Sequence, residues 1–343
     1  MVSFVLYENP AMRERLEVKL PLQSLVNIEE LAREMQIPEY VDLRDFQTRK
    51  IVVALYATQH SSRALRREPL KIGLFGGGAF KLHCPSSNRG PFSRKIGDVD
   101  FVTLKEDGQT LVDILLNLPE KYGTLFYHGI SSGDKRFNTM RARMRYRVHT
   151  IKDIDESGVP VGGLMDIFCD KLTFCHTINV RDELQRADKN LFTIGLENMI
   201  ISKAQLIKRL PKQETGSIDE NRILGAYDKN HVLVGMETKD MKDVAVAFLD
   251  HDLGDGNEKI NVDLIGRKLV QDWGAWKTVL MNLTNMSKRA RLIMWGFGAS
   301  RGETEIIEDR LGRIVEQLEG KYAPKKKFSF SKQWWEEVQD QVL

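Results

Sequence analysis

The chain has 343 residues, of which 42% are hydrophobic and 29% are charged, and its formal net charge is +3. This composition is ordinary for a soluble globular protein, and so small a net charge does not by itself indicate binding to nucleic acid. The longest apolar runs, such as residues 51–57, are far too short to span a bilayer. Three cysteines in a chain of this length favour reduced thiols, and the N-terminus lacks a basic start and a long apolar stretch, so we expect a cytoplasmic protein.

The N-terminal segment, residues 1–68, is expected to be helical. Asn27 and Glu30 have the spacing of a capping box at a helix start, and Pro38 ends this first helix. Residues 43–68 predict a second, longer helix, because apolar side chains recur along one side of it.

Residues 69–190 change to short strands and turns and are expected to form the core of the protein. Residues 140–149 alternate strictly between apolar side chains and arginines, as in a strand with one buried face. Those arginines would either bind the phosphates of an NTP or a polynucleotide, or form a solvated charged face. The expected strands are residues 71–75, 98–104, 140–149 and 164–169, the expected helices are residues 77–84 and 110–118, and the arginines are Arg141, Arg143, Arg145 and Arg147.

Residues 191–343 are expected to be mainly helical. Residues 211–239 are polar and contain glycine, which predicts a loop, and Trp334 and Trp335 are expected to dock the tail onto the fold. The expected helices are residues 196–210, 241–249, 262–283 and 304–318. The whole pattern predicts an α/β (α+β) protein, with a small mixed sheet, flanking helices and a C-terminal helical domain.

Two aspartates, Asp98 and Asp100, are one residue apart in an expected strand. Because alternate side chains of a strand point to the same face, the two carboxylates project together and repel each other unless a cation lies between them. Oxygen ligands of this kind suit Mg²⁺, which binds through one or two carboxylates together with substrate phosphates.

A glycine turn, Gly76-Gly77-Gly78, precedes these aspartates at the expected start of a helix. Backbone N–H groups at such a helix start can bind phosphate. The turn lacks the Gly-Lys-Ser/Thr ending of a Walker loop, and its glycines do not have dinucleotide-binding spacing.

A third aspartate, Asp166, interrupts the apolar run of residues 164–169. A buried carboxylate without a partner is costly, so Asp166 either begins a turn, pairs with an arginine, or belongs to a site. If its strand lies beside the strand of Asp98 and Asp100, three carboxylates converge, as in a site that holds two Mg²⁺ ions across a phosphoryl transfer.

These motifs together resemble the polymerase-beta-type nucleotidyltransferases, which combine a glycine turn, an Asp-x-Asp strand and a later strand carboxylate. The chain is similar in particular to minimal nucleotidyltransferases of bacteria and archaea, including the abortive-infection toxin type, over roughly residues 70–250. The residues that carry the resemblance are Phe75-Gly-Gly-Gly-Ala79, Arg94 and Lys95 before Asp98-Val-Asp100, Met165-Asp-Ile167, and the following segments 196–203 and 239–243. One departure is a longer gap between the glycines and Asp98, where residues 84–91 look inserted.

The resemblance implies Mg²⁺-dependent transfer of an NMP from an NTP to an acceptor hydroxyl, with release of pyrophosphate. RNA or a protein would be the acceptor, and a partner or antitoxin protein would be a further binding partner. The residues implied are Asp98, Asp100 and Asp166 for metal and catalysis, and Gly76, Gly77, Gly78, Arg94, Lys95 and Lys203 for the nucleotide.

Two other functions are compatible with the same residues. Asp98 and Asp100 also match the nucleophile motif of haloacid-dehalogenase-type phosphatases, although residues 93–97 are not the apolar strand that this motif follows. A non-catalytic, nucleotide-binding regulatory module would keep the fold without turnover.

Overall fold

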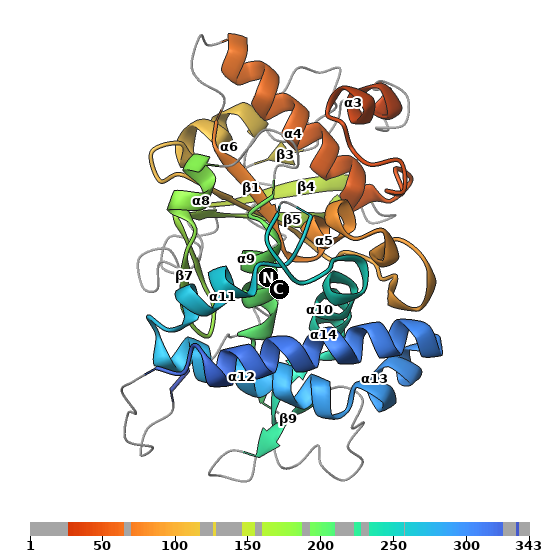
Figure 1. Ribbon diagram of the computed structural model, residues 1–343. Helices are drawn as coiled ribbons and strands as arrows, with labels where there is room; N and C mark the ends of the chain where they lie inside the picture. Colours follow the sequence, from red (N-terminus) through yellow and green to blue (C-terminus); the bar gives the residue numbers. More distant parts are fainter. Residues whose placement is uncertain are drawn as a thin grey trace.

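The computed structural model describes ten stretches of the chain, and all structural statements refer to them. They are residues 27–64, 70–116, 126–127, 146–154, 160–186, 193–209, 223–227, 233–256, 258–324 and 334–335. The described part contains both helices and strands, which agrees with the expected α+β class (Figure 1).

A five-stranded mixed sheet forms the centre of the N-terminal half, with the strand order β1-β2-β5-β4-β3. β2 runs antiparallel to β1 and parallel to β5, and β5 is antiparallel to β4. The strands are β1 (Ile72–Phe75), β2 (Val99–Thr103), β3 (Phe126–Tyr127), β4 (Tyr146–Ile154) and β5 (Pro160–Cys169). The strands expected at residues 71–75, 98–104 and 164–169 are therefore confirmed within a few residues, and 140–145 lie outside the described part.

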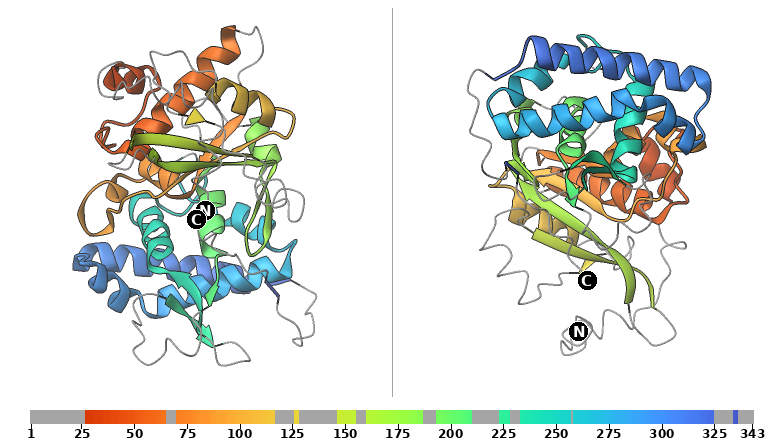
Figure 2. Two further views of the ribbon diagram at one scale, coloured as in Figure 1. Left: turned by 180° about the vertical axis from the view of Figure 1, so that it is seen from behind. Right: turned by 90° about the horizontal axis from the view of Figure 1, so that it is seen from below.

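Helices lie on both sides of this sheet, as Figures 1 and 2 show. On one side are α3 (Ile28–Glu34), α4 (Phe46–Ala64) and α6 (Gly108–Leu116), and the expected cap is present because the Asn27 side chain accepts a hydrogen bond from the Glu30 N–H. α5 (Gly76–His83) follows β1 directly, and α8 (Arg181–Arg186) follows the small hairpin β6 (Lys171–Thr173) and β7 (Thr177–Asn179). Two 3₁₀ turns, η2 (Pro85–Ser87) and η3 (Gly90–Phe92), connect α5 to β2.

The C-terminal half is a group of helices on the other side of the sheet (Figure 2). They are α9 (Leu196–Ala204), α10 (Thr238–Asp250), α11 (Val262–Leu269), α12 (Trp273–Lys288), α13 (Ala290–Phe297) and α14 (Arg301–Gly320). Capping side chains begin several of these helices, and at α14 Ser300 and Glu303 form a capping box. No helix in the described stretches is both long and apolar enough to cross a membrane.

Three expectations for this half are wrong. The single helix expected over residues 262–283 is two helices, because the Asp272 side chain accepts a hydrogen bond from the Ala275 N–H and begins α12 anew. The loop expected over residues 211–239 contains β9 (Ile223–Tyr227) and β10 (Leu233–Glu237), and β10 pairs with both β9 and β8 (Lys208–Arg209). β9 and β10 are only five residues long, so the polar residues around them dominate the local sequence pattern. The helix expected to reach residue 210 also ends earlier, at Ala204.

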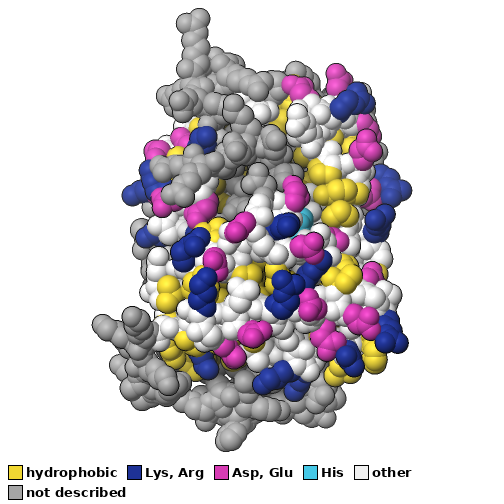
Figure 3. All heavy atoms as spheres, in the orientation of Figure 1, with side chains coloured by type: hydrophobic (Ala, Val, Ile, Leu, Met, Phe, Trp, Pro, Cys, Tyr) yellow, Lys and Arg dark blue, Asp and Glu magenta, His cyan; other side chains and the backbone are white. Residues whose placement is uncertain are grey.

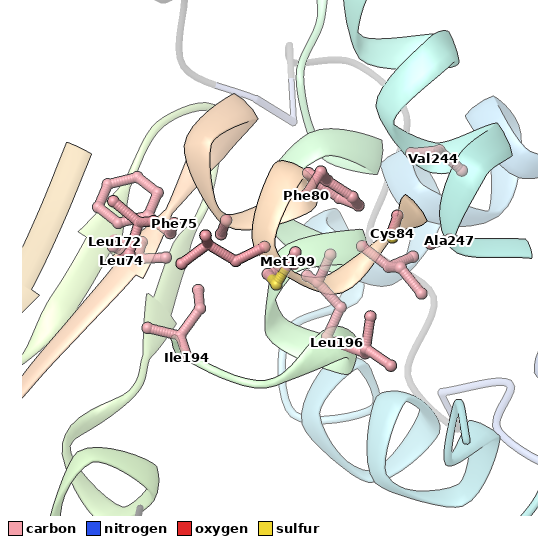
Figure 4. Packing of buried hydrophobic residues seen from close by; sticks show 14 of the residues in the cluster. Leu74, Phe75, Phe80, Cys84, Leu172, Ile194, Leu196, Met199, Val244 and Ala247 are labelled. Atoms are coloured by element: carbon pink, nitrogen blue, oxygen red, sulfur yellow. The ribbon is translucent and has the colours of Figure 1, made fainter. Parts of the chain in front are cut away.

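One continuous hydrophobic core joins the sheet to the helices on both sides, from Ile28 to Tyr322. Where α5 meets the C-terminal helices, Phe80 and Cys84 pack against Leu196 and Met199 of α9 and Val244 and Ala247 of α10 (Figure 4). The proposed boundaries after residues 68 and 190 remain predictions, since the three segments share this core.

The tail docks where the two tryptophans were expected to place it. The Trp334 Nε1–H donates a hydrogen bond to Thr278 Oγ1 at 3.1 Å, and Trp335 is 7% exposed. Trp335 packs in a small cluster with Cys175 and Ile207. The described tail residues therefore cover one end of α12.

Removing this cover should expose a thiol. We expect Trp335→Ala to raise the alkylation rate of Cys175 about tenfold, because Cys175 is 2% exposed and packs in one cluster with Trp335. Mass spectrometry of iodoacetamide-treated protein measures the rate for that cysteine alone. Trp295→Ala is the matched control, since Trp295 is 59% exposed on α13. Equal Cys175 alkylation in the two variants would show that the tail does not protect this site.

Candidate functional site

Two of the three aspartates lie side by side at the centre of the sheet. The parallel register of β2 and β5 pairs Asp100 with Asp166, so both side chains project from the same face. Asp166 is buried, at 8% exposure, and Asp100 is half-buried. Asp98 directly precedes β2 and is exposed, two residues from Asp100. The strand pairing on which the three-carboxylate site depends is therefore present.

The glycine turn lies directly against the Asp100 carboxylate. Gly76 follows β1 with φ of +65°, and a Cβ at this position would lie 2.5 Å from Asp100 Oδ2. Only glycine allows both the backbone angle and this approach. A Cβ at Gly77 would collide with the Arg94 guanidinium, whereas one at Gly78 would lie 2.8 Å from Ile51 Cδ1. The first two glycines thus face charged groups of the site, and the third allows α5 to pack on α4.

Burial and like charge act together on Asp100. Desolvation, followed by the neighbouring Asp98 and Asp166, holds the pKa of Asp100 well above its ordinary value, and Lys203 and Lys50 act in the opposite direction. The carboxylates therefore form a cluster that favours additional positive charge.

Lys203 and Arg94, both expected to bind nucleotide, meet at a buried pair of aspartates on α10. Lys203 Nζ lies 2.9 Å from Asp240 Oδ1 and 3.1 Å from Asp243 Oδ2. Arg94 donates two hydrogen bonds to Asp243, of 2.9 Å from Nε and 2.5 Å from Nη2. Asp240 and Asp243 are 2% and 4% exposed. Two cations and two carboxylates thus balance each other beside the glycine turn.

Within this group of four, the charged forms of Asp243 and Lys203 are favoured by their contacts. Although burial acts to raise it, Lys203 and Arg94 hold the pKa of Asp243 below its ordinary value. Burial likewise acts to lower the pKa of Lys203, but Asp240 and Asp243 raise it above its ordinary value. Sequence reasoning had placed residues 239–243 in the helical segment after the core without assigning a role to either aspartate.

A buried lysine, Lys50, is the site residue that sequence reasoning missed. It lies on α4 and is 1% exposed. The negative charges of Asp98, Asp100 and Asp166 act on its ammonium group. Burial lowers the pKa of Lys50 to about 8 against the opposing effect of these carboxylates. The signal was present in the helical pattern, because Lys50 is four residues after Phe46 on the expected apolar side of the helix.

The apparent insertion at residues 84–91 is fastened to the C-terminal helices. Ser86 donates hydrogen bonds to the Asp250 carboxylate from its backbone N–H, at 2.9 Å, and from its hydroxyl, at 2.6 Å. Lys242 Nζ donates to the Pro91 carbonyl oxygen at 2.9 Å. These contacts hold the segment that leads to Arg94 and bring that side chain to Asp243.

The other residues expected to bind phosphate are Lys95 and the arginines of residues 141–147. Lys95 is exposed, and Arg141, Arg143 and Arg145 lie outside the described residues. Arg147 is the backbone partner of Asp166 in the pairing of β4 with β5. On the face in Figure 3, the basic and acidic side chains of the described residues are interspersed.

Comparison with known proteins does not identify a family for this chain. No protein-family model matches the chain, and neither a curated protein nor a solved structure matches it significantly.

Proposed function

We propose that this protein is a Mg²⁺-dependent nucleotidyltransferase that moves an NMP from an NTP to an acceptor hydroxyl and releases pyrophosphate. The observation that carries the proposal is the pairing of Asp100 with Asp166 in adjacent strands, directly against the left-handed turn at Gly76. This arrangement brings oxygen ligands for a metal next to the start of a helix, where backbone N–H groups can receive phosphate oxygens.

The residues present fit a magnesium ion by their chemistry. Asp98, Asp100 and Asp166 offer only oxygen ligands, and the raised pKa of Asp100 beside two further carboxylates supports a place for an added cation. Within the described stretches, no three His, Cys, Asp or Glu side chains are gathered closely enough to hold a metal by themselves. Mg²⁺ commonly completes its coordination with water and substrate phosphates, and when bound it stabilises negative charge on the reacting phosphoryl group.

The protein's own groups would divide the remaining work. The first N–H groups of α5 would hold the triphosphate, since the side chain of Phe75, which precedes the helix, makes no capping hydrogen bond to them. Arg94 lies over Gly77 and Lys203 lies close enough to act on Asp100, so both cations would balance the charge of the phosphates. Asp166 would take the proton from the acceptor hydroxyl as that oxygen attacks the α-phosphorus and pyrophosphate leaves.

Labelled nucleotides test the proposal directly. Purified protein is incubated with each α-³²P-labelled NTP, Mg²⁺, and either total RNA or total protein, and the products are separated on gels. We expect label on one acceptor class, with loss of transfer when EDTA removes the metal. Label nowhere, with nucleotide bound but unchanged, would favour the regulatory module. Phosphate released from simple phosphoesters would favour the phosphatase.

A further inference from the structure

The burial of Lys50 on α4 is unusual for a lysine. Lysine is almost never fully buried unless a negative group balances its charge, and Lys50 is 1% exposed. Its Nζ lies 5.8 Å from the centroid of the Phe46 ring, which precedes it by one helical turn. The carboxylates that act on its charge are Asp98, Asp100, Asp166 and, more weakly, Asp45. Three of these four are the residues assigned above to metal.

α4 is held in place on both sides of Lys50. One turn before it, the Gln47 side chain donates a hydrogen bond to the Gly97 carbonyl oxygen at 2.8 Å, next to Asp98. The following residue, Ile51, fills the space above Gly78 at the start of α5. Lys50 therefore lies on a helix whose neighbouring residues contact Gly97, next to Asp98, and Gly78, in the glycine turn.

Three cations lie near the carboxylates of the site. Arg94 and Lys203 are balanced by Asp240 and Asp243 through direct ion pairs. Among the described side chains, Lys50 is the other cation whose charge acts on Asp100 besides Lys203. Lys50 and Lys203 therefore both act on Asp100, and Lys50 is also within the influence of Asp98 and Asp166.

We propose that Lys50 is a positioning residue that serves as a resident counter-charge for Asp100 and Asp166, so that the divalent cation binds together with the triphosphate and only weakly without it. The lysine supplies part of the charge that a metal would otherwise supply, and it repels a metal that arrives alone. A triphosphate adds negative charge and further oxygen ligands, which restores the attraction for metal. This inference rests on the proposed function and names a device that controls the same site.

Binding of Mn²⁺ to the nucleotide-free protein tests the counter-charge. We expect Lys50→Met to bind Mn²⁺ about tenfold more tightly than the wild type, because a positive charge close to the metal has been removed. Electron paramagnetic resonance of free Mn²⁺ measures the affinity. Lys50→Arg keeps the charge and should bind as the wild type does. Equal affinity of Lys50→Met and the wild type, or no binding by either, would overturn the inference.

The matched control is Lys81→Met. Lys81 is also a nearly buried helix lysine, at 8% exposure on α5, and its charge is not among those that act on Asp100. We expect this variant to leave the Mn²⁺ affinity unchanged. A tenfold gain in this control as well would show that the effect does not come from Lys50.

Thermal unfolding in EDTA distinguishes a counter-charge from a simple anchor for α4. Lys50→Met should lower Tm by roughly 5–10 °C, because the carboxylates that act on Lys50 lose a counter-charge. Adding Asp166→Asn should restore at least about half of that loss, because the unbalanced charge is then removed. If Lys50 only anchored α4, the double variant would unfold at the same temperature as Lys50→Met or lower.

These measurements need no catalytic turnover, so they separate this inference from the proposed function. Restored Tm in the double variant without any NMP transfer by the wild type would support the counter-charge and reject the enzyme. NMP transfer by the wild type, with no restoration in the double variant, would support the enzyme and reject the role of Lys50.

Discussion

Asp100→Asn is expected to lose Mg²⁺-dependent NMP transfer by roughly 1,000-fold or more, while the folded protein becomes slightly more stable without metal. The substitution removes the negative charge that would hold the metal but nearly preserves the shape of the side chain beside Gly76. The transfer assay with labelled NTP measures the first effect. Full activity in this variant would contradict the assignment of Asp100.

The gain in stability follows from the raised pKa of Asp100. Burial, with Asp98 and Asp166 beside it, makes the folded protein hold the Asp100 proton more tightly than the unfolded chain does. The contribution of Asp100 to stability is therefore favourable at low pH and is lost as the pH rises through its folded pKa. Asparagine removes this cost, so in EDTA the Tm of Asp100→Asn should exceed that of the wild type at pH 7.5.

The difference between the two Tm values should also depend on pH in a defined direction. It should be small near the pKa of an unfolded aspartate, about 3.9, and should grow as the pH rises. Asp113→Asn is the control, because Asp113 is exposed on α6 and accepts a hydrogen bond from Gln109. We expect the control to change neither transfer nor the pH profile. A Tm of Asp100→Asn below that of the wild type at pH 7.5 would show that the carboxylate is favourably paired.

The strands of the site could be predicted because their patterns are local. An apolar run interrupted by one aspartate indicated β5, and the Asp-Val-Asp alternation indicated the start of β2. The sequence could only pose the pairing of these strands as a condition, because about 60 residues separate them, and pairing depends on the whole sheet. The register that places Asp100 against Asp166 is the part that the structure adds.

The charged partners could not be predicted for a similar reason. Arg94 and Asp243 are 149 positions apart, and neither residue has a local pattern that indicates the other. Lys203 looks like an ordinary helix lysine until α10 brings Asp240 to it. Lys50 was predictable in principle, since it falls on the apolar side of its helix. In each case the missing information is which elements pack together.

Asp243→Asn should lower the stability by about 3–5 kcal/mol, or the Tm by roughly 5–10 °C. Asp243 is 4% exposed and pairs with both Arg94 and Lys203. The neutral amide leaves both cations in a buried setting, with Asp240 as the carboxylate of the group that still pairs with Lys203. Urea unfolding, with its slope compared between variants, measures the loss.

Asp250→Asn on the same helix is the matched control for this loss. Asp250 accepts two hydrogen bonds from Ser86 and has no cationic partner among the described ion pairs, so its replacement should cost only about 1 kcal/mol. Equal losses in the two variants would contradict a special role for the group of four.

Asp243→Asn also tests whether the nucleotide binds at this site. If Arg94 and Lys203 serve the triphosphate, a bound NTP supplies negative charge close to where Asp243 supplied it. Adding NTP with Mg²⁺ should therefore raise the Tm of Asp243→Asn by more than it raises the Tm of the wild type. Equal shifts would show that the nucleotide does not reach these cations. A larger shift in the variant would place the phosphates beside Gly77, where the Arg94 guanidinium lies against the glycine turn.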